Sequence, residues 1–169
     1  MRDPKVVETG LNHAAVDMVN TVQADIYGEF AKATLAVENA TFSFDNFVDA
    51  AALLNMENIE DAEIFAFVAP SDMAAIRKAL KDDLKYVEAF VRQGYVGSVA
   101  GINLYTKADA TPGTICGGIR EAVTVFNKKG VEVEQQREAN TRLNEVFSRK
   151  YYLAALTDAT KCFKIVKTA

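Results

Sequence analysis

Residues 64–80, with the sequence IFAFVAPSDMAAIRKAL, combine two structural elements in one stretch. Their first six residues are apolar without alternation, which is typical of a central strand buried on both faces. Pro70 closes this run, and Ser71 can cap a short helix that we expect from Asp72 to about Leu80. A buried strand that leads directly into a helix predicts a sheet covered by helices.

Upstream of this stretch, residues 4–33 show the apolar spacing of one long helix. Asp3 suits the N-cap position and Pro4 the first helical position. We expect the apolar face to pack on a sheet built from residues 122–167. This face contains Val7, Leu11, Ala14, Ala15, Met18, Val19, Val22, Ile26 and Phe30. A second helix is expected to follow an N-cap at Ser43 and to end near Met56.

Downstream, the pattern changes from helices to strands. A helix is expected over residues 84–92, and residues 107–118 are expected to form a loop because of their glycines and proline. Strands are expected over residues 102–106, 122–126, 131–136, 143–156 and 162–167. The second and third of these strands are separated by Asn127-Lys128-Lys129-Gly130, which is a hairpin signal. Helices early and strands late predict an α+β architecture.

Length and composition exclude several classes of protein. The chain has 169 residues and a formal net charge of −4, with no linker or repeat that would divide it. No apolar run approaches the roughly 18 residues of a membrane span, and the charged amino terminus shows no signal peptide. Nineteen basic residues against 23 acidic ones argue against a nucleic-acid binder. The two cysteines suggest a reducing compartment, with both thiols free and buried.

Residues for catalysis are scarce, and we expect no catalytic, cofactor-binding or metal site. His13 is the only histidine, and neither Cys116 nor Cys162 has a candidate partner, so all three are expected to be dispensable. The glycines of residues 94–101 follow a helix and precede a strand, which is the reverse of a phosphate-binding loop. The acidic residues between 57 and 63 indicate a solvated connector rather than a metal site.

One cluster of mixed charge surrounds the expected hairpin. It consists of Lys128, Lys129, Glu132, Glu134 and Arg137. Such a cluster is typical either of a soluble surface or of a contact between subunits, where opposite charges fix the register. The residues leave both interpretations open.

The order of these elements resembles that of the major capsid proteins of tailed phages and prophages. Residues 64–80 are similar to a segment in which a strand leads into a proline, an acidic residue and a short helix. Residues 94–106 resemble the glycine-bearing turn of that family, and residues 110–114 its following loop. Residues 124–138 and 150–166 resemble its late charged strands and its ending. The resemblance covers residues 43 to 169, and the first helix fits the family's spine helix.

This resemblance implies the Hong Kong 97-type capsid fold. Residues 1–40 and 120–169 would form a peripheral domain, with the spine helix packed on an antiparallel sheet. Residues 41–119 would form a mixed α/β axial domain. The implied function is structural: a capsid subunit that self-assembles into the icosahedral shell enclosing double-stranded DNA. A related encapsulin-like nanocompartment shell is an alternative within the same fold.

The resemblance also implies partners and a location. The partners would be other copies of the chain, with a scaffolding protein or protease during assembly, but no sequence-specific nucleic acid and no membrane. The shell would be assembled in the cytoplasm of a bacterial host and found in the virion. The family's amino-terminal arm and extended loop have no counterpart in this sequence. We therefore expect a monomer or a weak ring that salt loosens, rather than a closed shell.

The alternative from a different class is a small soluble α+β enzyme or ligand-binding protein. Its site would lie near residues 94–118, where two glycine-containing segments could line a pocket. A deep cleft with converging polar groups would favour this alternative.

Overall fold

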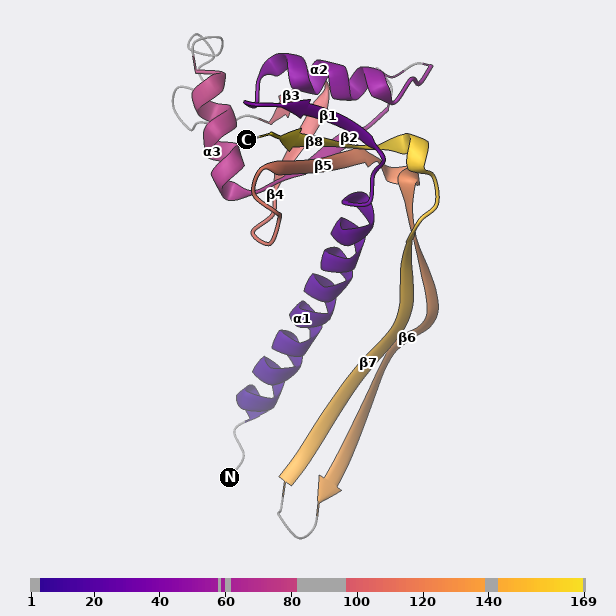
Figure 1. Cartoon of the computed structure of the whole chain (residues 1–169). Coiled ribbons are helices and arrows are strands. Elements are labelled where there is room, and N and C mark those ends of the chain that lie inside the picture. The colour runs from indigo at the N-terminus through magenta and orange to yellow at the C-terminus, as the bar shows by residue number, and fades with distance from the viewer. Residues whose placement is uncertain (1–3, 58, 60–61, 82–96, 139–142, 169) are drawn as a thin grey trace. The chain divides into compact units, whose positions relative to one another are not determined.

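The computed structural model describes residues 4–57, 59, 62–81, 97–138 and 143–168. The chain divides into two compact units (Figure 1). Unit 1 contains Met1–Ile26 and Val125–Ala155, and unit 2 contains Tyr27–Thr124 and Leu156–Ala169. Both units combine helix and strand, as the expected α+β class requires.

Unit 1 is a long helix with a two-stranded sheet. Helix α1 covers Pro4–Phe30 without interruption, as expected, although it ends three residues early. Among the described strands, β6 (Val123–Glu138) and β7 (Leu143–Leu156) pair with each other and with no other strand. The strand expected over residues 143–156 is therefore confirmed with its bounds.

The hairpin expected at residues 127–130 is wrong, because β6 runs through these residues as one continuous strand. A two-residue hairpin turn needs positive φ angles, and Gly130 does not adopt one. Strand β7 is 14 residues long and offers a partner along most of β6, so the ladder continues where the local sequence favours a turn. The expected strands over residues 122–126 and 131–136 are two parts of one strand.

Unit 2 is built on a six-stranded sheet in the order β1-β8-β5-β2-β4-β3. Strand β2 is parallel to β4 and antiparallel to β5, while β8 is parallel to β1 and antiparallel to β5. The strands are β1 (Leu35–Asn39), β2 (Ile64–Val68), β3 (Ser98–Val99), β4 (Ile102–Thr106), β5 (Thr114–Ile119) and β8 (Cys162–Lys167). The helices are α2 (Phe44–Leu53), α3 (Pro70–Ala79) and the 3-10 turns Arg120–Ala122 and Ala159–Lys161.

Helices α2 and α3 contribute to the main core of unit 2. Phe47 from α2 and Ile76 from α3 are almost completely buried there. Alternate residues of β2 enter the same core, namely Ile64, Ala66 and Val68. This burial of apolar surface is the main source of stability for the unit.

The other residues of β2 meet the last turn of α1. Phe30 lies edge-on to Phe65 and Phe67, with ring centroids 5.3 and 5.9 Å apart, and Tyr27 lies 6.0 Å from Phe67. Each such pair contributes about 0.5–1.5 kcal/mol beyond its buried area. The Tyr27 hydroxyl also accepts a hydrogen bond from the backbone N–H of Thr111 at 3.0 Å. The last turn of α1 is thus fixed to the sheet.

Three sequence expectations need correction in unit 2. Residues 114–119 form the interior strand β5 rather than a loop. Strand β1 was not expected, and residues 162–167 join the six-stranded sheet instead of pairing with β6 and β7. The helix expected over residues 84–92 lies outside the described residues.

Two glycines explain why β5 can occupy the interior of the sheet. A Cβ atom on Gly117 would lie 2.3 Å from the Phe65 carbonyl oxygen, and one on Gly118 would lie 2.3 Å from the Lys161 carbonyl oxygen. Neither site has room for a side chain. The Gly-Gly pair therefore marks close strand approach here, although such a pair usually indicates a turn.

We predict that Gly117→Ala lowers the free energy of unfolding by about 2–4 kcal/mol, because the added methyl group meets backbone atoms that cannot move aside. Gly10→Ala is the matched control, since nothing lies within 4 Å of its added Cβ and alanine favours the helix. Chemical denaturation monitored by circular dichroism measures both changes. Wild-type stability for Gly117→Ala would show that β5 does not pack as described.

Candidate functional site

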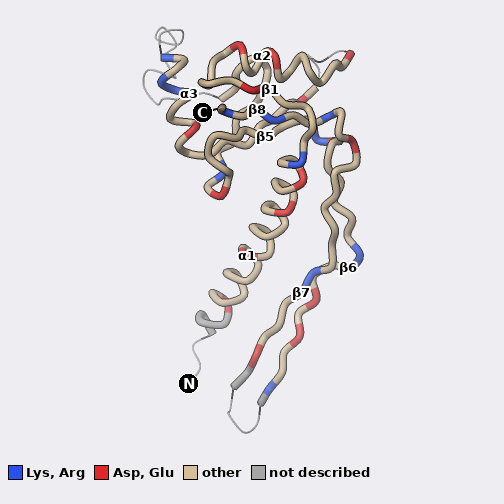
Figure 2. Tube along the Cα trace, in the orientation of Figure 1, with Lys and Arg blue, Asp and Glu red and all other residues tan. Residues whose placement is uncertain are grey.

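The charge cluster around residues 128–137 is partly satisfied within the hairpin of β6 and β7. Lys129 Nζ lies 2.9 Å from Glu132 Oε1, and Arg149 Nε on β7 lies 3.1 Å from Glu132 Oε2. The same guanidinium donates a second hydrogen bond to Glu134. Arg149 thus connects two carboxylates across the strand pair. Both basic and acidic residues lie along β6 and β7 (Figure 2). Sequence reasoning missed Arg149, which lies far from the cluster along the chain.

The remaining two members of the cluster have no such partner. Lys128 and Arg137 make no ion pair with any described residue, and Arg137 is exposed. Of the five residues proposed as subunit contacts, these two are the ones without an ion pair to a described residue. The contact role of all five stays a prediction.

The ion pairs shift the acidity of the groups involved. The hydrogen bond from Lys129, followed by that from Arg149, holds the pKa of Glu132 below its ordinary value. The charge of Glu134 and the hydrogen bond to Glu132 raise the pKa of Arg149. Both shifts favour the charged forms at neutral pH. The ion pairs that these charged groups form between β6 and β7 favour the register of the hairpin.

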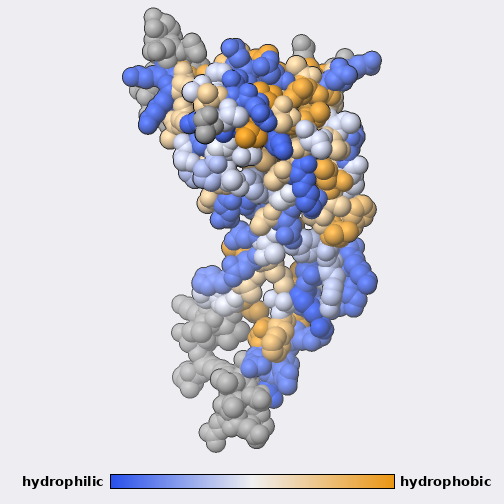
Figure 3. Space-filling view, in the orientation of Figure 1, coloured by the Kyte–Doolittle hydropathy of each residue, from blue (hydrophilic) through white to orange (hydrophobic). Residues whose placement is uncertain are grey.

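The hairpin also exposes large apolar side chains, which sequence analysis did not select. Phe126, Phe147, Tyr151 and Leu153 are each about half exposed, and Leu153 reaches 62%. The space-filling view shows such apolar side chains among hydrophilic ones on the surface (Figure 3). No alternation with charged residues marks these positions in the sequence, because Phe147 follows Val146 directly and Tyr151 is followed by Tyr152 and Leu153.

An apolar groove of about 530 Å³ lies between α1 and the hairpin within unit 1. Its lining confirms that the expected face of α1 is turned toward this sheet, although the helix and the strands leave space between them. Tyr152 on β7 donates a hydrogen bond to Asp25 on α1, which ties the two together. The groove is lined by Leu11, Ala14, Ala15, Met18, Val19, Val22, Gln23, Val131, Val133, Ser148 and Lys150.

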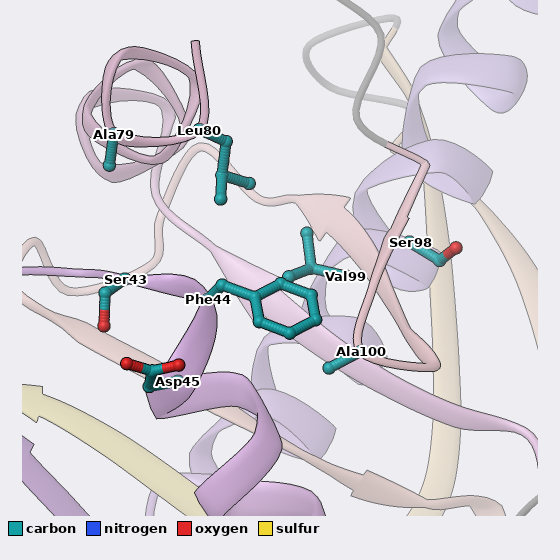
Figure 4. A pocket seen from close by; sticks show the side chains of 8 residues that line it. All are labelled: Ser43, Phe44, Asp45, Ala79, Leu80, Ser98, Val99 and Ala100. Carbon is teal, nitrogen blue, oxygen red and sulfur yellow. The ribbon is translucent and has the colours of Figure 1, made fainter. Parts of the chain in front are cut away.

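A second pocket, of about 570 Å³, lies in unit 2 between the start of α2 and the end of α3. The ring of Phe44 lies beside Val99 and Ala100, with Leu80 across from it (Figure 4). Among the described lining residues, Asp45 supplies the one ionisable side chain. The lining reaches residues 98–100 of the stretch considered for an enzyme site, and its described members do not bring together the converging polar groups that such a site needs.

The candidate nucleophiles and ligands lie on three different elements of the chain. His13 is exposed on α1 in unit 1, while Cys116 and Cys162 are buried on β5 and β8 in unit 2. Burial raises the pKa of the Cys116 thiol to about 11, and it also raises that of Cys162. Within the described ranges, no three histidine, cysteine or acidic side chains gather as metal ligands. In the same ranges, no helix is long and apolar enough to cross a membrane.

We predict that Arg149→Met lowers the melting temperature at neutral pH, because Glu132 and Glu134 lose their shared partner. The pKa of Glu132 is lowered in the folded chain, so its stabilising contribution is present at neutral pH and is lost as the pH falls through that value. The difference in melting temperature between the variant and the wild type should therefore narrow as the pH falls below the ordinary pKa of a glutamate. Arg137→Met is the control, since Arg137 pairs with no described residue. A difference that is independent of pH would contradict this account.

We predict that both thiols resist alkylation in the folded protein. A thiol with a pKa of about 11 holds little thiolate at pH 8, and neither sulfur atom is exposed. N-ethylmaleimide should add to neither cysteine in native protein and to both in denaturant, as mass spectrometry measures. Fast labelling of native Cys116 would contradict the described burial.

Similarity to known proteins appears at the level of structure. No protein-family model matches the chain, and no curated protein matches it significantly. Solved structures match across most of its length. The structure of Mycobacterium phage Che8 aligns with a TM-score of 0.73 at 15% identity, over 94% of this chain and 63% of that one.

Two further structures extend the comparison. The capsid of the empty GTA particle aligns with a TM-score of 0.76 at 16% identity, covering 96% of this chain and 67% of that one. The mature capsid of bacteriophage PhiM1 aligns with a TM-score of 0.67 at 12% identity, covering 98% and 65%. The chain thus spans about two thirds of these proteins. At such low identity the comparison establishes the fold, and the expected Hong Kong 97-type capsid fold is confirmed.

Proposed function

We propose that this chain is the major capsid subunit of a tailed bacteriophage or prophage, and that copies of it assemble into a shell around double-stranded DNA. The observation that carries this proposal is the alignment of 96% of the chain with a capsid structure at a TM-score of 0.76. The shell would be found in the virion and assembled in the host cytoplasm, with a scaffolding protein or protease as further partners.

The surface of the chain supports an assembling protein. Unit 1 leaves Val16 and Val19 of α1 more than half exposed, along with the apolar residues of the hairpin. Exposed apolar patches of this kind mark interaction surfaces. Copies of the chain would cover them in a shell.

The domain division also becomes part of this proposal. The two compact units would correspond to a peripheral and an axial domain, expected over residues 1–40 with 120–169 and over residues 41–119. The chain passes from one compact unit to the other after Ile26, after Thr124 and after Ala155. Strands β1 and β8 would then lie in the axial sheet, because they pair with each other and β8 pairs with β5.

The enzyme alternative has no comparable support. The pocket that reaches residues 98–100 is lined mainly by apolar side chains, with Ser43, Asp45 and Ser98 as its polar members. An encapsulin-like shell would share the fold and differ from a phage capsid in what it encloses. Analysis of the contents of the particles would therefore distinguish these two kinds of shell.

We predict concentration-dependent rings for the purified chain at low salt. Exposed charged contacts weaken as salt screens them, so the rings should dissociate at about 1 M salt. Sedimentation velocity at low and high salt measures their size, and negative-stain electron microscopy shows their symmetry. Shells would also support the proposal. A compact dimer without rings would contradict it.

A further inference from the structure

One long stretch of unit 2 contains acidic residues and no basic ones. Residues 33–76 form a run of 44 residues with eight acidic side chains and no lysine or arginine. Helix α2 lies in this run and exposes Asp45 and Asp49, while Glu57 is exposed just after it. The surface of α2 is therefore acidic, with no basic side chain of its own to neutralise it.

Helix α2 also carries apolar side chains that do not face the core of unit 2. Phe47, Ala50 and Leu54 face the core of unit 2. On the outside, Phe44 is 47% exposed and Val48 is 43% exposed. These two side chains are one helical turn apart, so they form a continuous apolar strip beside the carboxylates.

Helix α3 has exposed basic residues and small side chains, in contrast to the acidic and large apolar ones of α2. Arg77 and Lys78 in its last turn are exposed, and neither pairs with an acidic side chain among the residues described. Lys81 follows them and is also exposed. Ala74 and Ala75 on the outer face are small, so a large side chain from another molecule can approach the helix backbone closely.

We propose that α2 of one copy docks on the outer face of α3 of the next copy, head to tail. Phe44 and Val48 would pack against Ala74 and Ala75, while the carboxylates of α2 face the basic end of α3. This inference rests on the proposed shell function and assigns the surfaces that join neighbours. Two copies of α2 would repel each other, as would two copies of the basic end, so the charges favour the mixed contact. A head-to-tail contact builds rings, whereas a self-paired contact stops at a dimer.

Charge reversal tests the contact. Asp49→Lys with Glu57→Lys, and separately Arg77→Glu with Lys78→Glu, should each weaken self-association about tenfold or more. Combining all four changes reverses both surfaces, so association should return to near the wild-type value. Glu8→Lys with Asp17→Lys on α1 is the matched control for charge. Circular dichroism verifies folding, and sedimentation equilibrium at low salt measures association. Failure of the combined variant to recover, while it remains folded, would overturn the proposal.

Cross-linking distinguishes this contact from other arrangements. Asp49→Cys and Lys78→Cys are made in separate chains of different tag length, and a short bismaleimide is added to each alone and to their mixture. The native thiols are buried and should not react. Dimers that join the two different chains should predominate. If cross-linked dimers of like chains predominate, the head-to-tail contact is wrong. It is also wrong if mixed dimers form but sedimentation shows no assembly larger than a dimer, because a head-to-tail contact should continue into a ring. Rings that form without this cross-link would overturn the contact while leaving the shell function intact.

Discussion

The burial of one face of β2 and the partial burial of the other is the constraint on which the rest of the structure depends. One set of its side chains, Ile64, Ala66 and Val68, enters the core to which α2 and α3 contribute. The other set, Phe65 and Phe67, packs against aromatic rings from the last turn of α1. Because both faces must be covered, the helices of unit 2 and the end of α1 have little freedom. The apolar run of residues 64–69 thus determines which segments surround the central strand.

The parts of the fold that could be predicted are those whose local pattern agrees with their final environment. Helix α1 keeps three-to-four spacing along its length, and residues 143–156 are rich in strand-forming side chains. The errors arise where distant partners decide. Gly130 stays extended because β7 supplies a long partner, and Gly117 lies inside a sheet because β2 approaches too closely for a side chain. Strand β1 depends on its parallel pairing with β8, which is more than 120 residues away in sequence.

In the candidate site, too, the residues that could be predicted are close together in sequence, and the one that could not is distant. Charge spacing on one strand selected Lys129, Glu132 and Glu134, yet the residue that joins the two carboxylates is Arg149 on the neighbouring strand. Because these charges are neutralised within the hairpin, they fix its register. The exposed apolar side chains beside them remain without a partner in the described chain, which is the arrangement expected of a subunit completed by its neighbours.

Hydrogen–deuterium exchange at low and at high protein concentration tests this account most directly. The account predicts that amides of α2, α3 and the hairpin of β6 and β7 become more protected when the chain associates. The amides of β2 and β5 should exchange slowly at both concentrations, because their protection comes from the core of unit 2. If the amides of α2, α3 and the hairpin exchange equally fast in associated and in dilute chains, other copies do not cover the exposed apolar surfaces.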